Sequence, residues 1–320
     1  MEAVFERIYA TGLVPVIAID DAQQAVPLAK ALLAGGLDVA EVTFRTAAAA
    51  EAIGRIRNEL PEMLVGAGTV LTEEQMQQAQ AAGASFVVTP GFNSALVRRA
   101  VEQSIPIVPG TATPGEMEQA MVLGLNTVKF FPAEQNGGLD KLKALAGPYP
   151  SLRFMPTGGI NIQNLPAYIR FSKTLACGGS WMVKPALINA GAWDEITRLT
   201  KEAVDAMLGL ELKHVGINPL PGQSALQAAA TLERAFGFGW DEGTKSVFGG
   251  GRAFELMKAK GPGRMGHVAI GTNSLDRAVH HLKRRGFEVD ETSRVEKNGA
   301  PVAVYLKQEI SGFAFHLLQK

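Results

Sequence analysis

Lys129 lies at the end of a short apolar strand predicted within Asn-Thr-Val-Lys-Phe-Phe-Pro-Ala-Glu at residues 126–134, and its amine could perform covalent chemistry. Burial disfavours a charged ammonium, so a lysine in an apolar site has a pKa below the free value of roughly 10.4. The neutral amine can attack a ketone and form a Schiff base. The alternative is a structural lysine whose stem covers apolar surface while its charge reaches solvent.

A second candidate group ends the apolar segment at residues 39–44. The period-two alternation of a strand places Glu41, Thr43 and Arg45 on one face. A carboxylate and a guanidinium inside a protein can form a structural ion pair. They can equally provide a general base beside a clamp for a substrate carboxylate, because arginine binds carboxylates with two hydrogen bonds.

Small residues follow several other apolar segments. Gly-Ala-Gly-Thr at 66–69 and Thr-Pro-Gly at 89–91 are each weak turn signals. Pro-Thr-Gly-Gly-Ile-Asn at 156–161 and Cys-Gly-Gly-Ser at 177–180 form a more informative pair. Glycine-rich loops after the last two strands of a barrel bind phosphate through backbone N–H groups, and two unrelated turns are the alternative.

Strand-like and helix-like segments alternate from residue 14 to about 208, which predicts parallel strands joined by right-handed crossovers. The count matches a (β/α)₈ TIM barrel. A doubly wound open sheet is the alternative, although no glycine fingerprint follows the first strand. The predicted strands are 14–19, 39–44, 63–66, 85–88, 105–108, 127–130, 153–155 and 174–177, and the predicted helices include 22–34, 47–58, 73–82, 95–102, 115–123 and 192–209.

The pattern changes after residue 209. A strand at 212–218, a helix at 223–235 and short strands over 236–258 are followed by the same order at 265–270, 275–284 and 286–319. This repeat of about 50 residues reads as two βαβββ modules. We therefore predict an α/β barrel domain at residues 1–209 and a smaller α+β domain at residues 210–320, consistent with a length that exceeds one ordinary core.

The bulk composition excludes several classes of function. With 31 basic and 31 acidic residues there is no electrostatic case for a nucleic-acid or membrane partner. No apolar run reaches the length of a membrane span, and Met1 leads into Glu2, Glu6 and Arg7 rather than into an apolar signal segment. Cys177 is the only cysteine. We expect a soluble, cytoplasmic protein.

Six motifs in order resemble those of the 2-keto-3-deoxy-6-phosphogluconate (KDPG) and 4-hydroxy-2-oxoglutarate (KHG) aldolases, and the resemblance covers roughly residues 5–208. These are class I aldolases on a (β/α)₈ barrel, typically homotrimeric. The motifs are Val-Pro-Val-Ile at 14–17, Glu-Val-Thr-Phe-Arg-Thr at 41–46, Gly-Ala-Gly-Thr-Val at 66–70, Lys-Phe-Phe-Pro-Ala-Glu at 129–134, Pro-Thr-Gly-Gly-Ile at 156–160 and Gly-Gly-Ser-Trp at 178–181.

The resemblance implies a lyase of the Entner–Doudoroff type that needs no cofactor. It would cleave a keto-deoxy sugar acid to pyruvate and an aldehyde. Lys129 would form the Schiff base with the ketone, and Glu41 would move protons during dehydration of the carbinolamine and the C–C bond step. The implied substrate-binding residues are Arg45 and Thr69 for the pyruvyl carboxylate, Pro90, Phe131 and Thr157 for the pocket, and Gly158, Gly159, Gly179 and Ser180 for the distal phosphate.

The sequence departs from the family after its first strand. Several relatives carry a basic residue there that can reach the phosphate, whereas this chain has Asp20 and Asp21. That difference favours unphosphorylated 4-hydroxy-2-oxoglutarate, while the paired glycine loops favour the phosphorylated sugar acid. We expect the phosphorylated substrate, as either the gluconate or the galactonate isomer.

Residues 210–320 resemble, through element order and a few residues, the vicinal oxygen chelate superfamily that includes glyoxalase I and the extradiol dioxygenases. In that superfamily the first and last strands of each module hold a metal. The resemblance implies a divalent metal bound by His214, Glu255, His267 and His316, and these residue types suit zinc, nickel, manganese or iron. The alternative is a scaffold in which these are ordinary polar strand residues. We expect His280 and His281 to lie on a solvated helix face.

Three functions follow for the whole chain. The first is a metal-independent class I aldolase with an added module. The second is a metal-dependent enzyme, glyoxalase-like or dioxygenase-like, in which the barrel is auxiliary. In the third, the C-terminal module senses a metabolite or makes an oligomer contact. A phosphosugar isomerase or epimerase on the barrel is disfavoured, because that chemistry does not need a Schiff-base lysine.

Overall fold

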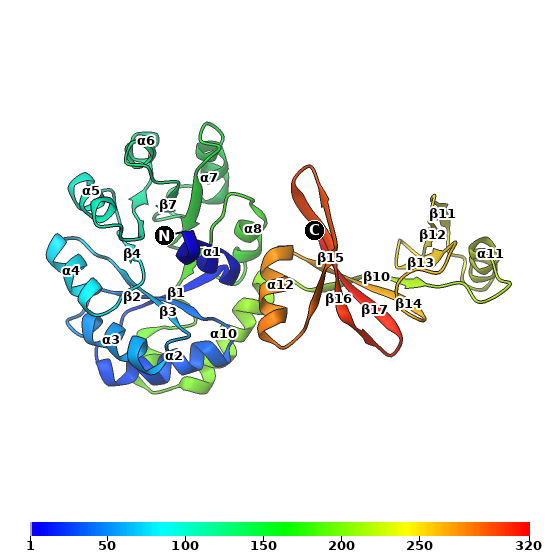
Figure 1. Cartoon of the computed structure of the whole chain (residues 1–320), viewed down its shortest axis with the longest axis horizontal. Coiled ribbons are helices and arrows are strands. Elements are labelled where there is room, and N and C mark those ends of the chain that lie inside the picture. Colours follow the sequence, from blue (N-terminus) through cyan, green and yellow to red (C-terminus); the bar gives the residue numbers. More distant parts are fainter. Residues whose placement is uncertain (1) are drawn as a thin grey trace. The chain divides into compact units, whose positions relative to one another are not determined.

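A computed structural model describes residues 2–320 and divides the chain into two compact units between Met207 and Leu208. In the N-terminal unit, helices α2 to α8 are arranged around the strands, as Figure 1 shows in blue to green. No helix within residues 2–320 is long and apolar enough to cross a membrane.

The strands of the N-terminal unit are short and mostly buried. Both faces of a parallel sheet covered by helices are apolar, which explains the near-continuous apolar runs. The strands are β1 (Leu13–Ile17), β2 (Val39–Thr43), β3 (Leu64–Gly68), β4 (Val87–Val88), β5 (Ile107–Val108), β6 (Gly110–Thr111), β7 (Thr127–Phe130), β8 (Arg153–Pro156) and β9 (Cys177–Gly179).

All of the pairings among these strands are parallel. One sheet has the order β5-β4-β3-β2-β1-β9, and a second has the order β6-β7-β8. Only Pro109, which lacks a backbone N–H, separates β5 from β6. Bridges between Phe154 and Thr174 and between Thr157 and Gly178 connect the β8 segment with the β9 segment.

Helices follow the strands along the chain, and several begin at capping residues. Asn93 caps α5, and Thr113 with Glu116 forms a capping box at α6. Helix α1 packs Val4, Phe5 and Tyr9 against a buried cluster that includes Val14 and Val39. The helices are α1 (Glu2–Thr11), η1 (Ala22–Gln24), α2 (Ala25–Ala34), α3 (Ala49–Glu59), α4 (Glu73–Ala81), α5 (Ser94–Glu102), α6 (Pro114–Val122), α7 (Gly138–Ala146), α8 (Leu165–Arg170), α9 (Pro185–Asn189) and α10 (Trp193–Leu208).

The C-terminal unit contains one mixed sheet in which the order βαβββ occurs twice. The sheet order is β11-β12-β13-β10-β14-β17-β16-β15, so the first strands of the two repeats, β10 and β14, lie side by side and antiparallel. The elements are β10 (Glu211–Ile217), α11 (Ala225–Phe236), β11 (Trp240–Glu242), β12 (Ser246–Gly249), β13 (Phe254–Met257), β14 (Gly266–Thr272), α12 (Leu275–Arg284), β15 (Val289–Lys297), β16 (Ala300–Ile310) and β17 (Phe313–Gln319).

The alternation of strands and helices predicted for the N-terminal part is confirmed, and β7 and α12 have the predicted bounds. The last strand of the N-terminal unit does not have its predicted bounds. It begins at Cys177, whereas the sequence predicted 174–177. The expectation of a solvated face for His280 and His281 was wrong, because His281 is only 2% exposed and His280 is half-buried.

Candidate active site

Lys129 is the third residue of β7 and is 4% exposed. This burial excludes the alternative of a structural lysine whose ammonium reaches solvent. Burial lowers its pKa below the ordinary value, and the nearby Arg45 guanidinium lowers it further, whereas the Glu41 carboxylate opposes the shift. A depressed pKa increases the fraction of neutral amine at neutral pH. The environment of Lys129 therefore favours a nucleophilic amine.

Glu41 lies on β2 with its carboxylate close to this amine. Its Oε1 is 3.9 Å from the Lys129 Nζ, and its side chain is fully buried. Neither carboxylate oxygen accepts a hydrogen bond from the residues that the structure describes. A buried carboxylate without hydrogen-bond donors, at ion-pair distance from an amine, can take up and return protons.

Gly68, at the end of β3, is what makes room for this carboxylate. A Cβ atom built on Gly68 would lie 2.0 Å from the Glu41 Oε1. As a sequence motif, Gly-Ala-Gly-Thr indicated only a weak turn, and this contact was missed. The spacing alone could not reveal it, because it depends on the register in which Thr43 pairs with Gly68.

Arg45 does not continue the strand as the period-two alternation predicted. Strand β2 ends at Thr43, whose hydroxyl donates to the Ile17 carbonyl at 2.7 Å, and Arg45 is exposed in the following turn. Its guanidinium nevertheless contributes to the lowered pKa of Lys129. Thr69 follows β3 with a φ of 54° and is half-buried.

Phe131 and Pro90 follow two different strands, β7 and β4. The Lys129 Nζ is 4.9 Å from the centre of the Phe131 ring. Pro90 lines a cavity of about 300 Å³ at the carboxyl end of β4, together with Val70, Leu71, Thr89, Gly91, Phe92 and Asn93. Thr89 holds this turn, because its hydroxyl donates to the Gly91 carbonyl at 2.6 Å and accepts from the Gly110 N–H.

The two glycine-rich loops are adjacent. Thr157 is buried and forms a bridge with Gly178, and a Cβ atom on Gly178 would lie 2.3 Å from the Thr157 hydroxyl oxygen. Gly158 and Gly159 have φ values of 96° and 79°, which glycine adopts without strain. A Cβ atom on Gly179 would similarly lie 2.0 Å from the Trp181 ring, and Ser180 is exposed beside it.

Known proteins that resemble this chain share the segment that carries these residues. The family model for KDPG and KHG aldolases matches residues 4–199. The chain belongs to this family. It is 50% identical over 204 residues to the 2-dehydro-3-deoxy-phosphogluconate aldolase of Treponema pallidum, covering 64% of this chain and 97% of that protein. It is 47% identical over 201 residues to the KHG/KDPG aldolase of Escherichia coli K12, covering 62% of this chain and 94% of that protein.

Solved structures of aldolases in this family also match. The KDPG aldolase of Legionella pneumophila, with pyruvate captured as a covalent carbinolamine intermediate, has a TM-score of 0.61 and 40% identity, covering 62% of this chain and 97% of that one. The enzyme of Zymomonas mobilis ZM4 with 3-phosphoglycerate has a TM-score of 0.59 and 43% identity, covering 63% of this chain and 95% of that one. The N-terminal unit therefore has the α/β fold of these aldolases.

Asp21, one of the two acidic residues that follow the first strand, has a local structural role. Its carboxylate accepts a hydrogen bond from the Gln23 N–H at 2.9 Å and caps η1. A carboxylate is well suited to the start of a helix, because it satisfies a backbone donor there. The acidic residue thus stabilises the turn after β1.

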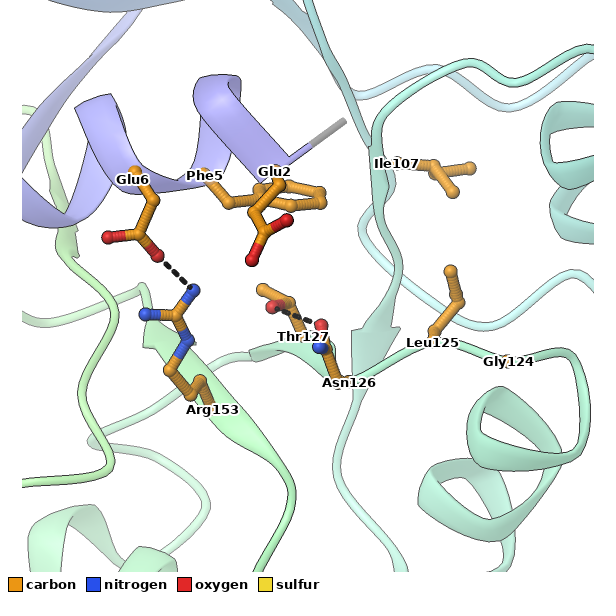
Figure 2. A pocket seen from close by; sticks show the side chains of 9 residues that line it. All are labelled: Glu2, Phe5, Glu6, Ile107, Gly124, Leu125, Asn126, Thr127 and Arg153. Atoms are coloured by element: carbon orange, nitrogen blue, oxygen red, sulfur yellow. Dashed lines mark hydrogen bonds and ion pairs between the residues drawn. The ribbon is translucent and has the colours of Figure 1, made fainter.

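A separate cavity of about 300 Å³ lies at the amino ends of β5, β7 and β8, away from the predicted aldolase residues (Figure 2). Glu6 of α1 reaches across it to Arg153, at 3.2 Å. The cavity contains none of the side chains predicted for the aldolase reaction. It is lined by Glu2, Phe5, Glu6, Ile107, Gly124, Leu125, Asn126, Thr127 and Arg153.

The C-terminal unit brings together the four predicted metal ligands. The Glu255 Oε2 lies 3.1 Å from the His214 Nε2 and 3.0 Å from the His267 Nε2, and these two nitrogens are 3.2 Å apart. His214, His267 and His316 each place a ligand atom within 4.8 Å of the others. Three imidazoles so close together could hold a metal ion.

Two neighbours of this cluster were missed in the sequence. Ser246 donates to the second oxygen of Glu255 at 2.6 Å, and the Tyr305 ring stacks on His316 with centroids 4.6 Å apart. Burial raises the pKa of Glu255, but hydrogen bonds from His214, His267 and Ser246 outweigh it and leave the pKa below the ordinary value. Burial, with the two neighbouring histidines, lowers the pKa of His316 to about 3, which keeps its imidazole neutral and available as a ligand.

Proposed function

We propose that this protein is a class I aldolase in which Lys129 carries the substrate as a Schiff base. One observation carries the proposal, namely the buried amine of Lys129, with a lowered pKa, 3.9 Å from the buried carboxylate of Glu41. An amine that is neutral near pH 7 can add to a ketone, and the carboxylate can move the protons that the addition requires.

The strand pairings support a (β/α)₈ barrel for the N-terminal unit. Every neighbouring pair is parallel, β5 and β6 continue one another across Pro109, and the bridges link β8 to β9, which pairs with β1. Lys129 and Glu41 belong to strands of this ring, and the glycine loops follow its last two strands. Active sites of such barrels lie at the carboxyl ends of the strands, which agrees with this placement.

The reaction begins when the Lys129 amine adds to the C2 ketone and forms a carbinolamine. Glu41 donates a proton to the hydroxyl group, which leaves as water, and the product is an iminium. Glu41 then accepts the proton of the C4 hydroxyl, and the C3–C4 bond breaks so that C4 leaves as the carbonyl carbon of the aldehyde. The electron pair of the broken bond forms the C2–C3 double bond of an enamine and neutralises the iminium. Protonation at C3 and hydrolysis release pyruvate and restore the amine.

The remaining residues implied by the family resemblance would bind the two ends of the substrate. Arg45 and Thr69 would hold the pyruvyl carboxylate, because a guanidinium and a hydroxyl are suitable donors for it. Phe131, Pro90 and Thr157 would shape the pocket, and the loops with Gly158, Gly159, Gly179 and Ser180 would receive a distal phosphate through backbone donors. We therefore infer that the substrate is a 2-keto-3-deoxy-6-phospho-aldonate, which yields glyceraldehyde 3-phosphate, with 4-hydroxy-2-oxoglutarate, which yields glyoxylate, as the unphosphorylated alternative.

The test is the rate of pyruvate release from both substrates, measured by coupling to NADH oxidation with lactate dehydrogenase. We expect wild-type protein to cleave at least one of them, and EDTA to leave the rate unchanged. Lys129→Ala should abolish cleavage. Lys143→Ala, which removes an exposed lysine on α7, is the matched control. Cleavage retained by folded Lys129→Ala protein would overturn the proposal.

The family resemblance further suggests a homotrimer. With a chain mass of 34.0 kDa, three copies would give 3 × 34.0 = 102 kDa. Light scattering coupled to size exclusion measures this mass directly. A single species at the mass of one or two chains would contradict a trimer.

A second function is proposed for the C-terminal unit because four potential ligands converge there from β10, β13, β14 and β17. These are the first and last strands of each βαβββ repeat, as in the vicinal oxygen chelate superfamily. Three imidazoles and one carboxylate suit zinc, nickel, manganese or iron. A metal held there would supply a Lewis acid, and the adjoining cavity of about 450 Å³, lined in part by Tyr305, Ser293 and Lys307, would admit a small molecule.

Metal content after mild purification tests this second function, together with the effect of EDTA on the melting temperature. We expect about one equivalent of a divalent metal per chain, and loss of it in His267→Ala. His280→Gln, on α12 and outside the cluster, is the control variant. Wild-type protein should also be incubated with each metal in turn before the metal content is measured. Less than about a tenth of an equivalent of metal per chain after that incubation would contradict a metal site.

Deletion of residues 210–320 separates an enzymatic role of this unit from a sensing or oligomer-forming role. If the shortened protein keeps full aldolase activity and the same oligomeric state, the metal-dependent activity is the function left for the C-terminal unit. A changed oligomer, or loss of a metabolite response, would favour the non-catalytic role.

A further inference from the structure

Glu134 and Tyr168 form a hydrogen-bonded pair between the segment after β7 and helix α8, which follows the first glycine-rich loop. Glu134 follows β7, five residues after Lys129, and Tyr168 lies on α8. The Tyr168 hydroxyl donates to the Glu134 Oε1 at 2.5 Å. Tyr168 is 1% exposed, and its burial, together with this carboxylate, raises the pKa of its hydroxyl. The hydroxyl therefore stays protonated and remains a donor.

The Glu134 side chain also packs directly on the proposed phosphate loop. A Cβ atom on Gly159 would lie 2.6 Å from both the Cβ and the Cγ of Glu134. The backbone of the two loops is joined as well, because the Glu134 N–H donates to the Gly158 carbonyl at 3.1 Å. On its other side the loop is held by Asn161 and Asn164, whose amides donate to the Gly159 carbonyl at 3.2 and 3.1 Å.

This arrangement places a carboxylate beside a loop that is proposed to bind a phosphate. Two anions on one loop repel each other, and the repulsion depends on where the carboxylate points. The Tyr168 hydroxyl holds the Glu134 Oε1 toward α8. The direction of the carboxylate is thus set by a donor on α8.

We propose that Tyr168 is a specificity-determining positioning residue, which fixes the Glu134 carboxylate so that the Gly158–Gly159 loop can accept a phosphorylated substrate. The proposal rests on the proposed aldolase function and concerns only the phosphate end of the substrate. Tyr168 acts through Glu134 and the loop and touches neither the Schiff base nor the ketone.

The test compares KM for the phosphorylated and the unphosphorylated substrate in the full-length protein. Tyr168→Phe removes the hydroxyl alone, and we expect KM for the phosphorylated substrate to rise about tenfold. KM for 4-hydroxy-2-oxoglutarate and kcat for both substrates should change less than about twofold. Because screened charges interact weakly, the rise in KM should shrink with added salt, which a change in packing alone would not produce.

Two further variants keep the test decisive. Glu134→Asp shortens an exposed side chain, breaks the same hydrogen bond and keeps the charge, so it should raise the same KM even if Tyr168→Phe does not fold. The double variant Tyr168→Phe with Glu134→Gln lacks the negative charge of the Glu134 carboxylate. We expect KM for the phosphorylated substrate to return to within about threefold of wild type.

The chain offers a matched control pair. The Tyr149 hydroxyl donates to the Glu118 Oε1 at 2.8 Å, away from both glycine loops, so Tyr149→Phe removes the same kind of hydrogen bond elsewhere. It should change neither KM. Equal effects of Tyr168→Phe or Glu134→Asp on both substrates, or a rise in KM that salt does not reduce, would overturn the proposal. Failure of the aldolase function itself would appear instead as no cleavage by wild-type protein.

Discussion

The Lys129 amine and the Glu41 carboxylate lie 3.9 Å apart inside the N-terminal unit, close enough for an ion pair and beyond hydrogen-bonding distance. Burial lowers the pKa of the amine more strongly than the carboxylate raises it. A structural ion pair would need better geometry and further hydrogen bonds to offset the cost of burying two charges. The pair is therefore better suited to catalysis than to stability.

Glu41→Gln should separate proton transfer from Schiff-base formation. The amide keeps the size of the side chain but cannot take up a proton, so we expect kcat to fall by about 10²–10⁴-fold. Because the Glu41 charge raises the pKa of Lys129, its loss should also move the pH midpoint of pyruvate trapping to lower pH. The control is Glu51→Gln, an exposed position on α3. An unchanged kcat would rule out Glu41 as the proton carrier.

Burial of Lys129 should leave a mark on the pH dependence of stability. The folded-state pKa is below the ordinary value of 10.5, so between these two values the unfolded chain binds more protons than the native protein. The free energy of unfolding contributed by this lysine therefore rises with pH through that window and is lost as the pH falls below the folded-state pKa.

Urea unfolding of wild type and Lys129→Met at pH 7 and pH 10 measures this effect. We expect wild type to gain stability relative to Lys129→Met as the pH rises, with Lys143→Met as the control for an exposed lysine. A gain in the opposite direction would show that the fold stabilises the ammonium, which is incompatible with a neutral, nucleophilic amine near pH 7.

Gly68→Ala tests whether the space beside Glu41 is needed. The new methyl group would lie 2.0 Å from the Glu41 Oε1, so the carboxylate has to move. Displacement of a catalytic group by about 1 Å costs on the order of 100-fold in rate, and we expect kcat to fall by that amount. Gly115→Ala on α6, where a Cβ atom meets nothing within 4 Å, is the matched control. Wild-type kcat in Gly68→Ala would mean that the position of Glu41 does not matter.

Parts of this candidate site could be predicted from the sequence because their signals are local. Strand β7 has its predicted bounds, and a lysine among apolar strand residues is conspicuous. The glycine-rich β9 was misplaced, since Cys177–Gly179 has little intrinsic strand preference and becomes a strand through pairing with β1.

Other features depend on contacts between distant parts of the chain. Glu134 and Tyr168 are 34 residues apart, and no pattern in the sequence joins them. Burial of His281 could have been inferred, because it lies three residues after the buried Ala278 and thus on the same helix face. The histidine cluster was found from element order, whereas its partners Ser246 and Tyr305 required the cross-strand register, which places Tyr305 opposite His316.

Gly216→Ala tests the proposed metal site without altering a ligand. Gly216 pairs with His267 across β10 and β14, and a Cβ atom there would lie 2.0 Å from the His267 Cε1. The imidazole has to move, so we expect metal affinity to fall about 10–100-fold by competition with a chelator. Gly239→Ala, where a Cβ atom meets nothing within 4 Å, should bind metal as wild type does. Equal affinity in both variants would contradict the assignment of His267 as a ligand.

The most direct test of the central claim is borohydride reduction of the full-length protein in the presence of pyruvate, followed by intact-mass measurement and peptide mapping. We expect one reduced pyruvate per chain, attached to the peptide that contains Lys129. An unmodified Lys129 in folded protein, or an adduct at another lysine, would contradict a Schiff base at this residue.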